Sequence, residues 1–376
     1  MKQGWEECNL EDYIKLIDYR GRTPVKTGSG VRLITAKNVK LGYLQLEPQE
    51  FIAANNYDSW MSRGIPNVGD VIFTTEAPLA NVAQIDTSEK LAFAQRIIVM
   101  QPKANKIDST FLKHMLLSEI VRKKILEKGT GATVLGIKSS LLKKIRISFP
   151  PLNEQQRIVA ILDEAFTKIG KAKTNAEQNL KNAKELFESY LQGVFKKKGD
   201  DWEEKALGEI IDIKNGKNQQ AVLSDTGEYK IMGSAGNVMG YATDFICEAG
   251  TTIIGRKGNI SKPLYINERF WNVDTAFGFY PKNKKEIDKR FIYYLCLGID
   301  FKSMNRGTTI PSLVKSELQT IQICFPKSFK IQQTIVKKLD ALIAETKKLE
   351  AIYEQKLKDL EELKKSVLQK AFSGEL

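Results

Sequence analysis

Few residues in this chain have the types and spacing that catalysis requires. His114 is the only histidine among 376 residues, so neither a Ser–His nor a Cys–His nucleophile pair has another histidine to use. It falls inside a predicted helix, where packing or surface exposure is the more ordinary role. The cysteines are scattered and form no Cys-x-x-Cys pair: Cys8, Cys247, Cys296 and Cys324. The sequence therefore predicts no catalytic centre, no metal site and no disulfide framework.

Two short stretches imitate known sites without completing them. The loop GTGATVLGIKSS resembles a phosphate loop, but Ile137 interrupts its Gly-Lys-Ser step and no such loop recurs in the second half. Glu203-Glu204-Lys205 could mimic part of a nuclease site, yet its repeat partner Glu6-Glu7-Cys8 lacks the lysine. Neither a Gly-x-Gly-x-x-Gly loop nor an adenine-methylation motif is found. We expect a chain with no catalytic activity and no cofactor of its own.

Cations in or beside predicted turns are the side chains with an evident chemistry. The chain has 58 Lys and Arg against 45 Asp and Glu, a formal charge of +13 that favours a polyanionic partner. Arg and Lys can neutralise phosphates or pair with guanine, and Asn and Gln can read adenine. The candidate DNA-binding residues are Arg20, Arg22, Lys26, Lys37, Asn38, Arg96, Lys217, Asn218, Gln219, Arg256, Lys257, Asn259 and Lys262.

Any one of these residues is equally consistent with a solvated surface side chain. The Arg256-Lys257 turn is the best candidate, because the glycines on both sides of it let the backbone come close to a ligand.

A long helix is the element expected to position these turns. The stretch from Phe149 to Phe195 opens with two prolines, and Asn153 is a candidate N-cap. An apolar stripe of period 3.5 follows, with polar Asn179 filling its one gap: Ile158, Leu162, Ala165, Ile169, Ala172, Ala176, Ala183, Leu186 and Tyr190. This period predicts a helix laid along another helix, roughly 60 Å long at 1.5 Å per residue.

The same stretch recurs near the end of the chain, from Phe325 to Phe372, at a shift of 177 residues. Its stripe consists of Ile335, Leu339, Leu342, Thr346, Leu349, Tyr353, Leu360, Leu363 and Val367. The polar gap falls at Lys356, the counterpart of Asn179, and a shared polar break is a plausible register device in a helix pair. Two long copies in one register favour mutual pairing over two separate core helices.

Each long helix follows a module of mixed α and β pattern. In the first module, Ser109 to Lys128 reads as one helix, and Asn38 to Gly42 reads as a hairpin connection. In the second, strands are expected at Ile210–Ile213, Thr251–Ile254, Leu264–Ile266 and Ala276–Tyr280, with a helix from Asp288 to about Leu297. The repeat shift falls from 197 to 176, so about twenty residues are missing from the middle of the second copy.

The sequence divides into a module at 1–152, a long helix at 153–199, a module at 200–326 and a long helix at 327–376. The start of the chain has no apolar signal region, and no run of eighteen apolar residues occurs. A cytoplasmic protein without a membrane span is therefore expected.

With these features the chain resembles the specificity subunit of type I restriction-modification systems. The resemblance rests on the Pro-Pro-Leu-x-Glu-Gln-Gln-x-Ile-Val opening at Pro150–Val159, its weaker copy at Pro326–Val336, and the Trp-Glu starts at Trp5 and Trp202. A Gly-Asp-Val-Ile-Phe run at Gly69–Phe73 and the terminal Leu-Gln-Lys-Ala-Phe-Ser-Gly-Glu-Leu add to it. The second copy departs from the motif at residues 327–330.

The resemblance implies an α+β fold, with two target recognition domains separated by two long conserved helices. These helices would form an antiparallel coiled coil with an internal pseudo-two-fold repeat. Each domain would read one half of a bipartite DNA target, and the helices would set the gap between the halves. The partners would be two methylation subunits, which bind S-adenosylmethionine, and two restriction subunits, which use ATP and Mg. Open alternatives are a fused, type II-like system and a coiled-coil scaffold with two protein-binding modules.

Overall fold

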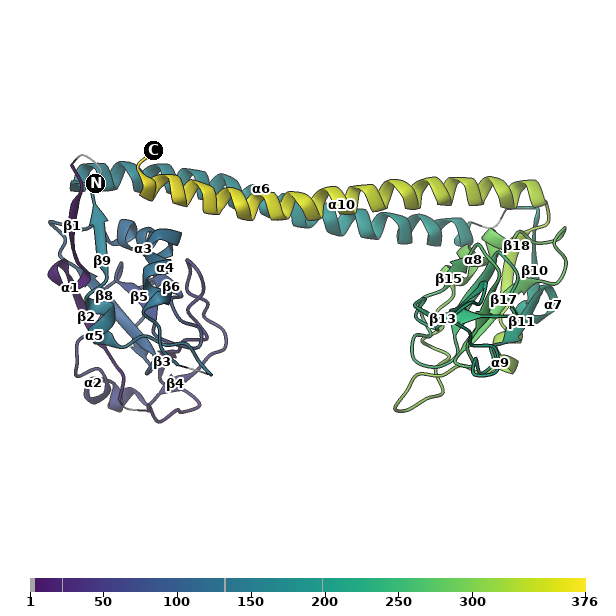
Figure 1. Cartoon of the computed structure of the whole chain (residues 1–376), viewed down its shortest axis with the longest axis horizontal. Coiled ribbons are helices and arrows are strands. Elements are labelled where there is room, and N and C mark those ends of the chain that lie inside the picture. Colours follow the sequence, from purple (N-terminus) through teal and green to yellow (C-terminus); the bar gives the residue numbers. More distant parts are fainter. Residues whose placement is uncertain (1–3, 22, 132, 198) are drawn as a thin grey trace. The chain divides into compact units, whose positions relative to one another are not determined.

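The computed structural model describes residues 4–21, 23–131, 133–197 and 199–376. The chain forms two compact units: Met1–Ala176 with Gln355–Leu376, and Glu177–Glu354. Each unit therefore contains one module together with part of each long helix (Figure 1).

The first module is built on a four-stranded antiparallel sheet of strand order β2-β8-β5-β6. Its strands are β2 (Ile14–Asp18), β8 (Ile97–Pro102), β5 (Val71–Thr74) and β6 (Val82–Gln84). A three-stranded sheet contains β4 (Phe51–Ile52), β3 (Val31–Ile34) and β7 (Leu91–Phe93), with β3 and β7 parallel. A separate antiparallel pair joins β1 (Glu6–Asn9) to β9 (Arg146–Phe149).

Short helices complete this module: α1 (Leu10–Tyr13), η1 (Ala54–Asn56), α2 (Tyr57–Trp60), α3 (Ser109–Leu117), α4 (Glu119–Glu127) and α5 (Ser139–Lys143). Every residue of β5 is buried, because its two faces contribute to two hydrophobic clusters. Phe73 and Val71 pack in the cluster that contains α3, whereas Ile72 packs with the three-stranded sheet. The continuous apolar run of β5 is thus that of a central strand with both faces covered.

The second module repeats this topology. Its four-stranded sheet has the order β11-β17-β14-β15, and its three-stranded sheet the order β13-β12-β16, again with one parallel pair. The elements are β10 (Trp202–Ala206), α7 (Leu207–Ile210), β11 (Ile211–Asn215), β12 (Tyr229–Met232), β13 (Val238–Ala242), β14 (Thr251–Gly255), β15 (Leu264–Ile266), β16 (Phe270–Asn272), β17 (Ala276–Pro281), α8 (Lys289–Gly298), α9 (Lys315–Gln319) and β18 (Gln322–Pro326). The expected strands and helix of this module are confirmed.

The residues that the second module lacks relative to the first lie between β12 and β14. In the first module the segment between β3 and β5 contains β4, η1 and α2, whereas between β12 and β14 the second contains only β13. The strands on either side keep the same pairing, so the shortening leaves the sheets intact.

The two long helices form as predicted, α6 at Leu152–Lys196 and α10 at Phe329–Ser373, each of 45 residues. Helix α6 begins at Leu152, so Asn153 lies inside the first turn and is not the N-cap. Within each unit the helices pack side by side and antiparallel (Figure 1). In the first unit Ile158 and Leu162 share a cluster with Ala371 and Phe372. In the second, residues late in α6 pack against residues early in α10.

The apolar stripe differs from the prediction in its later part. Asn179 and Lys356 are exposed, and the next residue of each helix, Leu180 and Leu357, is half-buried instead. Leu186, expected in the stripe, is 48% exposed. An ideal helix has 3.6 residues per turn, so a stripe with a strict period of 3.5 gradually moves around the helix surface. One additional spacing of four residues, from Ala176 to Leu180, returns the stripe to the face that contacts the other helix. The polar gap is therefore not a buried register device.

Two local predictions in the first module are also wrong. The expected helix from Ser109 to Lys128 is two helices, because Ser118 takes an extended backbone (ψ 146°) and caps α4 through its side chain. The expected hairpin around Asn38–Gly42 is a tight turn with one isolated bridge, Val39 to Leu44, and its second arm forms no strand.

Candidate nucleic-acid interface

Four backbone segments meet at one end of the four-stranded sheet in the first module. One segment follows β2, one follows β5 and one precedes β8. The fourth is the glycine loop, described at 129–131 and 133–138. The Thr75 amide donates to the Arg96 carbonyl at 2.9 Å, and the Ile137 amide donates to the Thr75 carbonyl at 2.9 Å. Arg20 Nη1 reaches the Ile137 carbonyl at 3.1 Å. We call this region the loop corner, and in this module it encloses a cavity of about 360 Å³.

The second module has the same loop corner. The Arg256 amide donates to the Thr275 carbonyl at 2.8 Å, and the Leu313 amide donates to the Arg256 carbonyl at 2.9 Å. The loop after β11 is held by the Lys217 amide, which donates to the Asn272 carbonyl at 2.9 Å. Strand pairing places Lys217 at the position of Arg20, and Arg256 at the position of Thr75.

The loop corners bring together most of the predicted DNA-binding residues. In the described part of the chain Arg20 and Arg96 lie at the first loop corner. In the second module Lys217, Asn218 and Gln219 lie on the loop after β11, and Arg256, Lys257, Asn259 and Lys262 lie on the loop after β14. Arg22 lies outside the described residues. The prediction grouped these residues as cations and amides in or beside turns, and the repeated sheet explains why distant turns meet.

Three predicted residues lie elsewhere, around the three-stranded sheet of the first module. Lys26 forms an ion pair with Glu50 at 2.8 Å, and Lys37 is exposed. Asn38 is only 1% exposed. Its Oδ1 accepts from the Thr35 amide and hydroxyl, and its Nδ2 donates to two loop carbonyls. Because this amide is fully used in closing its own loop, Asn38 is left out of the DNA-reading set proposed below.

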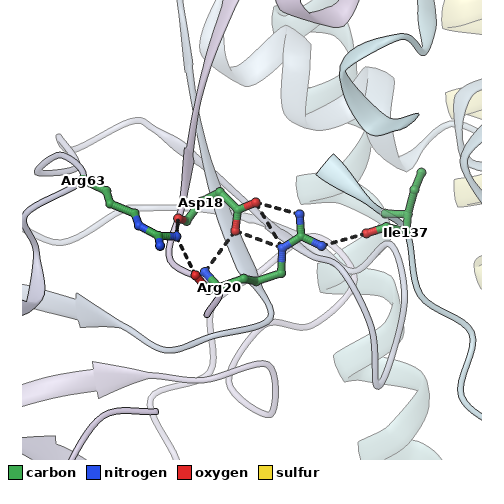
Figure 2. A network of polar contacts seen from close by, with 4 residues as sticks. All are labelled: Asp18, Arg20, Arg63 and Ile137. Atoms are coloured by element: carbon green, nitrogen blue, oxygen red, sulfur yellow. Dashed lines mark hydrogen bonds and ion pairs between the residues drawn. The ribbon is translucent and has the colours of Figure 1, made fainter. Parts of the chain in front are cut away.

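The two predicted arginines of the first loop corner are held by carboxylates. Arg20 binds Asp18 through Nε and Nη2, and Figure 2 shows Arg63 donating to the Asp18 and Arg20 carbonyls on the other side. Burial disfavours the Asp18 carboxylate, but the hydrogen bonds and charge of Arg20 outweigh burial and lower its pKa. Arg96 has a left-handed backbone, φ 82°, and its Nε lies 2.7 Å from Glu76 Oε1.

The cations of the second loop corner are less constrained. Arg256 is exposed and makes a long contact, 3.4 Å, to the Asp274 carbonyl. Lys217, Lys257 and Lys262 are exposed and form no ion pair with any residue that the structure describes. Lys257 replaces Glu76, so the position that neutralises Arg96 in one module adds a charge in the other.

Several loop-corner residues were missed by sequence reasoning. Gln95, Thr130 and Lys138 line the cavity of the first module together with Arg20 and Arg96. Gln95 directly precedes Arg96, and Lys138 ends the glycine loop that was examined only as a phosphate-binding loop. The internal repeat contains the signal for these residues, because aligning the two modules shows which loops lie at the same end of the four-stranded sheet.

His114 is buried, at 3% exposure, in helix α3. Burial is the main reason that its pKa falls to about 3, and Lys113 and Lys364 lower it further. A neutral, enclosed ring of this kind belongs to the core. Among the described residues no cluster of His, Cys, Asp or Glu could hold a metal ion, and no helix is long and apolar enough to cross a bilayer.

The chain belongs to the family of type I restriction modification DNA specificity domains, whose sequence model matches residues 3–181 and 199–359. The two matches correspond to the two halves of the internal repeat. Among similar proteins is the type I restriction enzyme MjaVIII specificity subunit of Methanocaldococcus jannaschii, 23% identical over all of this chain and 93% of that protein. The EcoDI specificity subunit of Escherichia coli is 27% identical over 47% of this chain and 39% of that protein.

Solved structures share the fold. One, from a study of complex assembly and conformational transition of the type I R-M system, has a TM-score of 0.80 at 18% identity. It is matched over 100% of this chain and 99% of that chain. The HsdS subunit of Thermoanaerobacter tengcongensis has a TM-score of 0.67 at 19% identity, over 100% of this chain and 98% of that one. The predicted α+β fold with two modules and long helices is confirmed.

Proposed function

We propose that this chain is the DNA-recognition subunit of a type I restriction-modification complex and that each module reads one half of a bipartite target. The modules at 1–152 and 200–326 would contact DNA, and the helices at 153–199 and 327–376 would set the gap between the half-sites. Family membership supports this proposal. A non-DNA coiled-coil scaffold, the alternative considered from sequence, has no comparable support.

The observation that carries the proposal is the loop corner, present in both modules on the same backbone frame with different side chains. The amide-to-carbonyl contacts of Thr75 recur at Arg256, while the side chains change from Thr75-Glu76 to Arg256-Lys257. A constant frame with variable side chains is what two readers of different half-sites require, since base edges are distinguished by side-chain donors and acceptors.

The two loop corners suit different parts of this task. Arg20 and Arg96 have their guanidinium groups oriented by carboxylates, and each would pair with a base edge after exchanging that carboxylate. Lys257 and Lys262 are free to reach phosphates, which gives salt-dependent affinity.

The chemical steps would fall to partner subunits. We propose two methylation subunits, which bind S-adenosylmethionine and methylate adenine, and two restriction subunits, which use ATP and Mg. In this arrangement the present chain is non-catalytic and carries no cofactor, and it acts in the cytoplasm. Its contribution is to select the DNA site and to recruit both partners.

The test is an adenine-methylation map of the source genome with this gene intact, deleted, and restored. We expect a split motif whose methylation disappears on deletion and returns on restoration. A purified complex with the methylation subunit should then retard DNA with both half-sites, and random DNA should compete poorly. A methylation map that is unchanged by deletion, together with no DNA preference of that complex, would refute the proposal.

A further inference from the structure

A buried glutamine joins the first module to the start of helix α6. Gln155 is fully buried, at 0% exposure. Its Nε2 donates to the Lys106 carbonyl at 2.9 Å and to the Pro150 carbonyl at 2.8 Å. Its Oε1 accepts from the Asp108 amide at 2.8 Å. One side chain thus links α6 to the end of β9 and to the segment that leads into α3, with every hydrogen bond made to main-chain atoms.

The second unit contains the same junction. Gln332 is also 0% exposed, and its Nε2 donates to the Glu286 carbonyl at 2.9 Å and to the Pro326 carbonyl at 2.8 Å. Its Oε1 accepts from the Asp288 amide at 2.8 Å. The distances agree at all three contacts, although the Pro-Leu-x-Glu part of the motif is lost before Gln332. We call this arrangement the glutamine latch.

A second contact between module and helix lies eight residues further along each helix, which is about 12 Å at 1.5 Å per residue. In the second unit Asp340 accepts from Arg290 Nε at 2.9 Å and from the Tyr294 hydroxyl. In the first unit the equivalent pair is Asp163 and His114, 3.4 Å apart, and neither ring nitrogen has a hydrogen-bond partner among the described residues. Among these polar contacts, the first module therefore depends more heavily on its latch.

We propose that Gln155 and Gln332 are positioning residues that fix the orientation of each module on its long helix and so restrict the complex to one gap length. This inference rests on the proposed function. The latch and the contact eight residues further along hold the module to the helix at two separate points. Two such points prevent the module from rotating about either one alone. A module that rocks would present its loop corner at a range of positions along DNA, and half-sites at neighbouring spacings would then become acceptable.

The test uses the complete chain assembled with its methylation subunit. The substrate is a DNA library that carries both half-sites from the wild-type methylation map at every gap length within a few base pairs. We expect Gln155→Met to raise methylation at gaps one base pair shorter or longer, relative to the native gap, by at least roughly five- to tenfold. The variant loses the three hydrogen bonds of the latch, and one net hydrogen bond already corresponds to about this factor. The bases preferred within each half-site should not change.

Each latch has a matched control beside it. Gln156 and Gln333 are exposed neighbours, so Gln156→Met and Gln333→Met should keep the sharp wild-type gap profile. Gln332→Met should broaden the profile less than Gln155→Met, because Arg290 and Tyr294 still hold Asp340. A Gln155→Met complex with the wild-type gap profile would overturn the inference, and so would a change in half-site bases.

A further measurement covers the case in which these variants fail to assemble. In the wild-type chain, hydrogen exchange at the Asp108 and Asp288 amides should be slow, since both donate to latch glutamines. Exchange as fast as in the surrounding loop would show that the latch is open and would overturn the inference. A wild-type complex that methylates no split site would instead contradict the proposed function itself.

Discussion

Single cations differ in how they are held, and under the proposed function this difference would separate base reading from phosphate binding. Arg20 and Arg96 are each paired with a carboxylate of their own module. Arg256 and Lys257 project from a turn without such a partner among the described residues. An unpaired exposed cation loses little when it binds a phosphate, whereas a paired one must first exchange its carboxylate.

Replacing both cations of the second turn should weaken binding through the second half-site. Arg256→Ala with Lys257→Ala should lower affinity and reduce the slope of log K against log salt by up to about 2, since each phosphate contact contributes close to one. Fluorescence anisotropy with DNA over a range of salt concentrations measures both. The control is Lys284→Ala with Lys285→Ala, which removes two exposed cations beyond the other end of β17. Equal salt slopes for both variants would contradict this assignment.

The buried histidine predicts a pH dependence of stability. The pKa of His114 is about 3 in the folded chain against 6.5 ordinarily, so between these values the unfolded chain binds an additional proton. The contribution of the neutral His114 ring to the free energy of unfolding is fully present above pH 6.5. It is lost as the pH falls, and the loss is roughly 2 kcal/mol by pH 5. Asp163, Lys113 and Lys364 face the ring, and only Asp163 would favour its protonation.

Removing the titrating group should reduce that loss. His114→Gln keeps a polar side chain of similar size that does not titrate, so its free energy of unfolding should fall less between pH 7.5 and pH 5 than that of the wild type. Urea unfolding at the two pH values measures this. An identical fall for both chains would mean that His114 is protonated without cost and that its burial is not maintained in solution.

At the scale of elements, the long helices could be predicted because their signal is repeated many times along the chain. Beyond Ala176 the sequence did not show which residues of the helix face its partner. A period of 3.5 places Asn179 in the apolar stripe, although Leu180 is the next residue. The accumulated difference between 3.6 and 3.5 residues per turn selects Leu180. The break at Ser118 was missed for a related reason: a serine that can cap a helix is also tolerated inside one.

The corrected phase is tested by a pair of leucines on α6. Leu180 is half-buried and Leu186 is 48% exposed. Leu180→Ala should lower the free energy of unfolding by about 1–2 kcal/mol, less than for a fully buried leucine. Leu186→Ala should change it by no more than about 0.5 kcal/mol. Chemical denaturation of both variants gives the comparison, and the reverse order would restore the stripe predicted from the 3.5 period.

At the scale of the whole molecule, the duplication could be predicted and the interface only in part. Turn cations such as Arg20 and Arg256 were identified from their neighbours in sequence, and the repeated sheet brings the loop of each to the loop corner of its own module. Their partners could not be foreseen. The pairing of Arg96 with Glu76 depends on a left-handed backbone at Arg96, and the burial of Asn38 depends on a turn that closes on its amide. Such contacts arise only when separate loops are packed together.

If the long helices set the gap between the half-sites, as proposed, shortening them should change the DNA spacing without changing the DNA sequence that is recognised. Residues 170–176 of α6 and 355–361 of α10 lie in the same compact unit, where Lys173 pairs with Glu361 at 2.5 Å. Deleting both segments removes seven residues from each helix and leaves the stripe nearly in phase, since seven residues are close to two turns. The helix pair becomes about 10 Å shorter, so the preferred gap should shrink by about three base pairs while the half-sites stay the same.

The deletion variant is assayed with the methylation subunit on the same gap-length library. Deleting 170–176 from α6 alone is the control, because it leaves the facing segment of α10 unpaired and should abolish a defined gap. If the double deletion assembles and still prefers the wild-type gap, the helices do not measure the distance between half-sites. The loop corners would then find their targets through the flexibility of DNA or of the partner subunits, and the long helices would serve only to dock those partners.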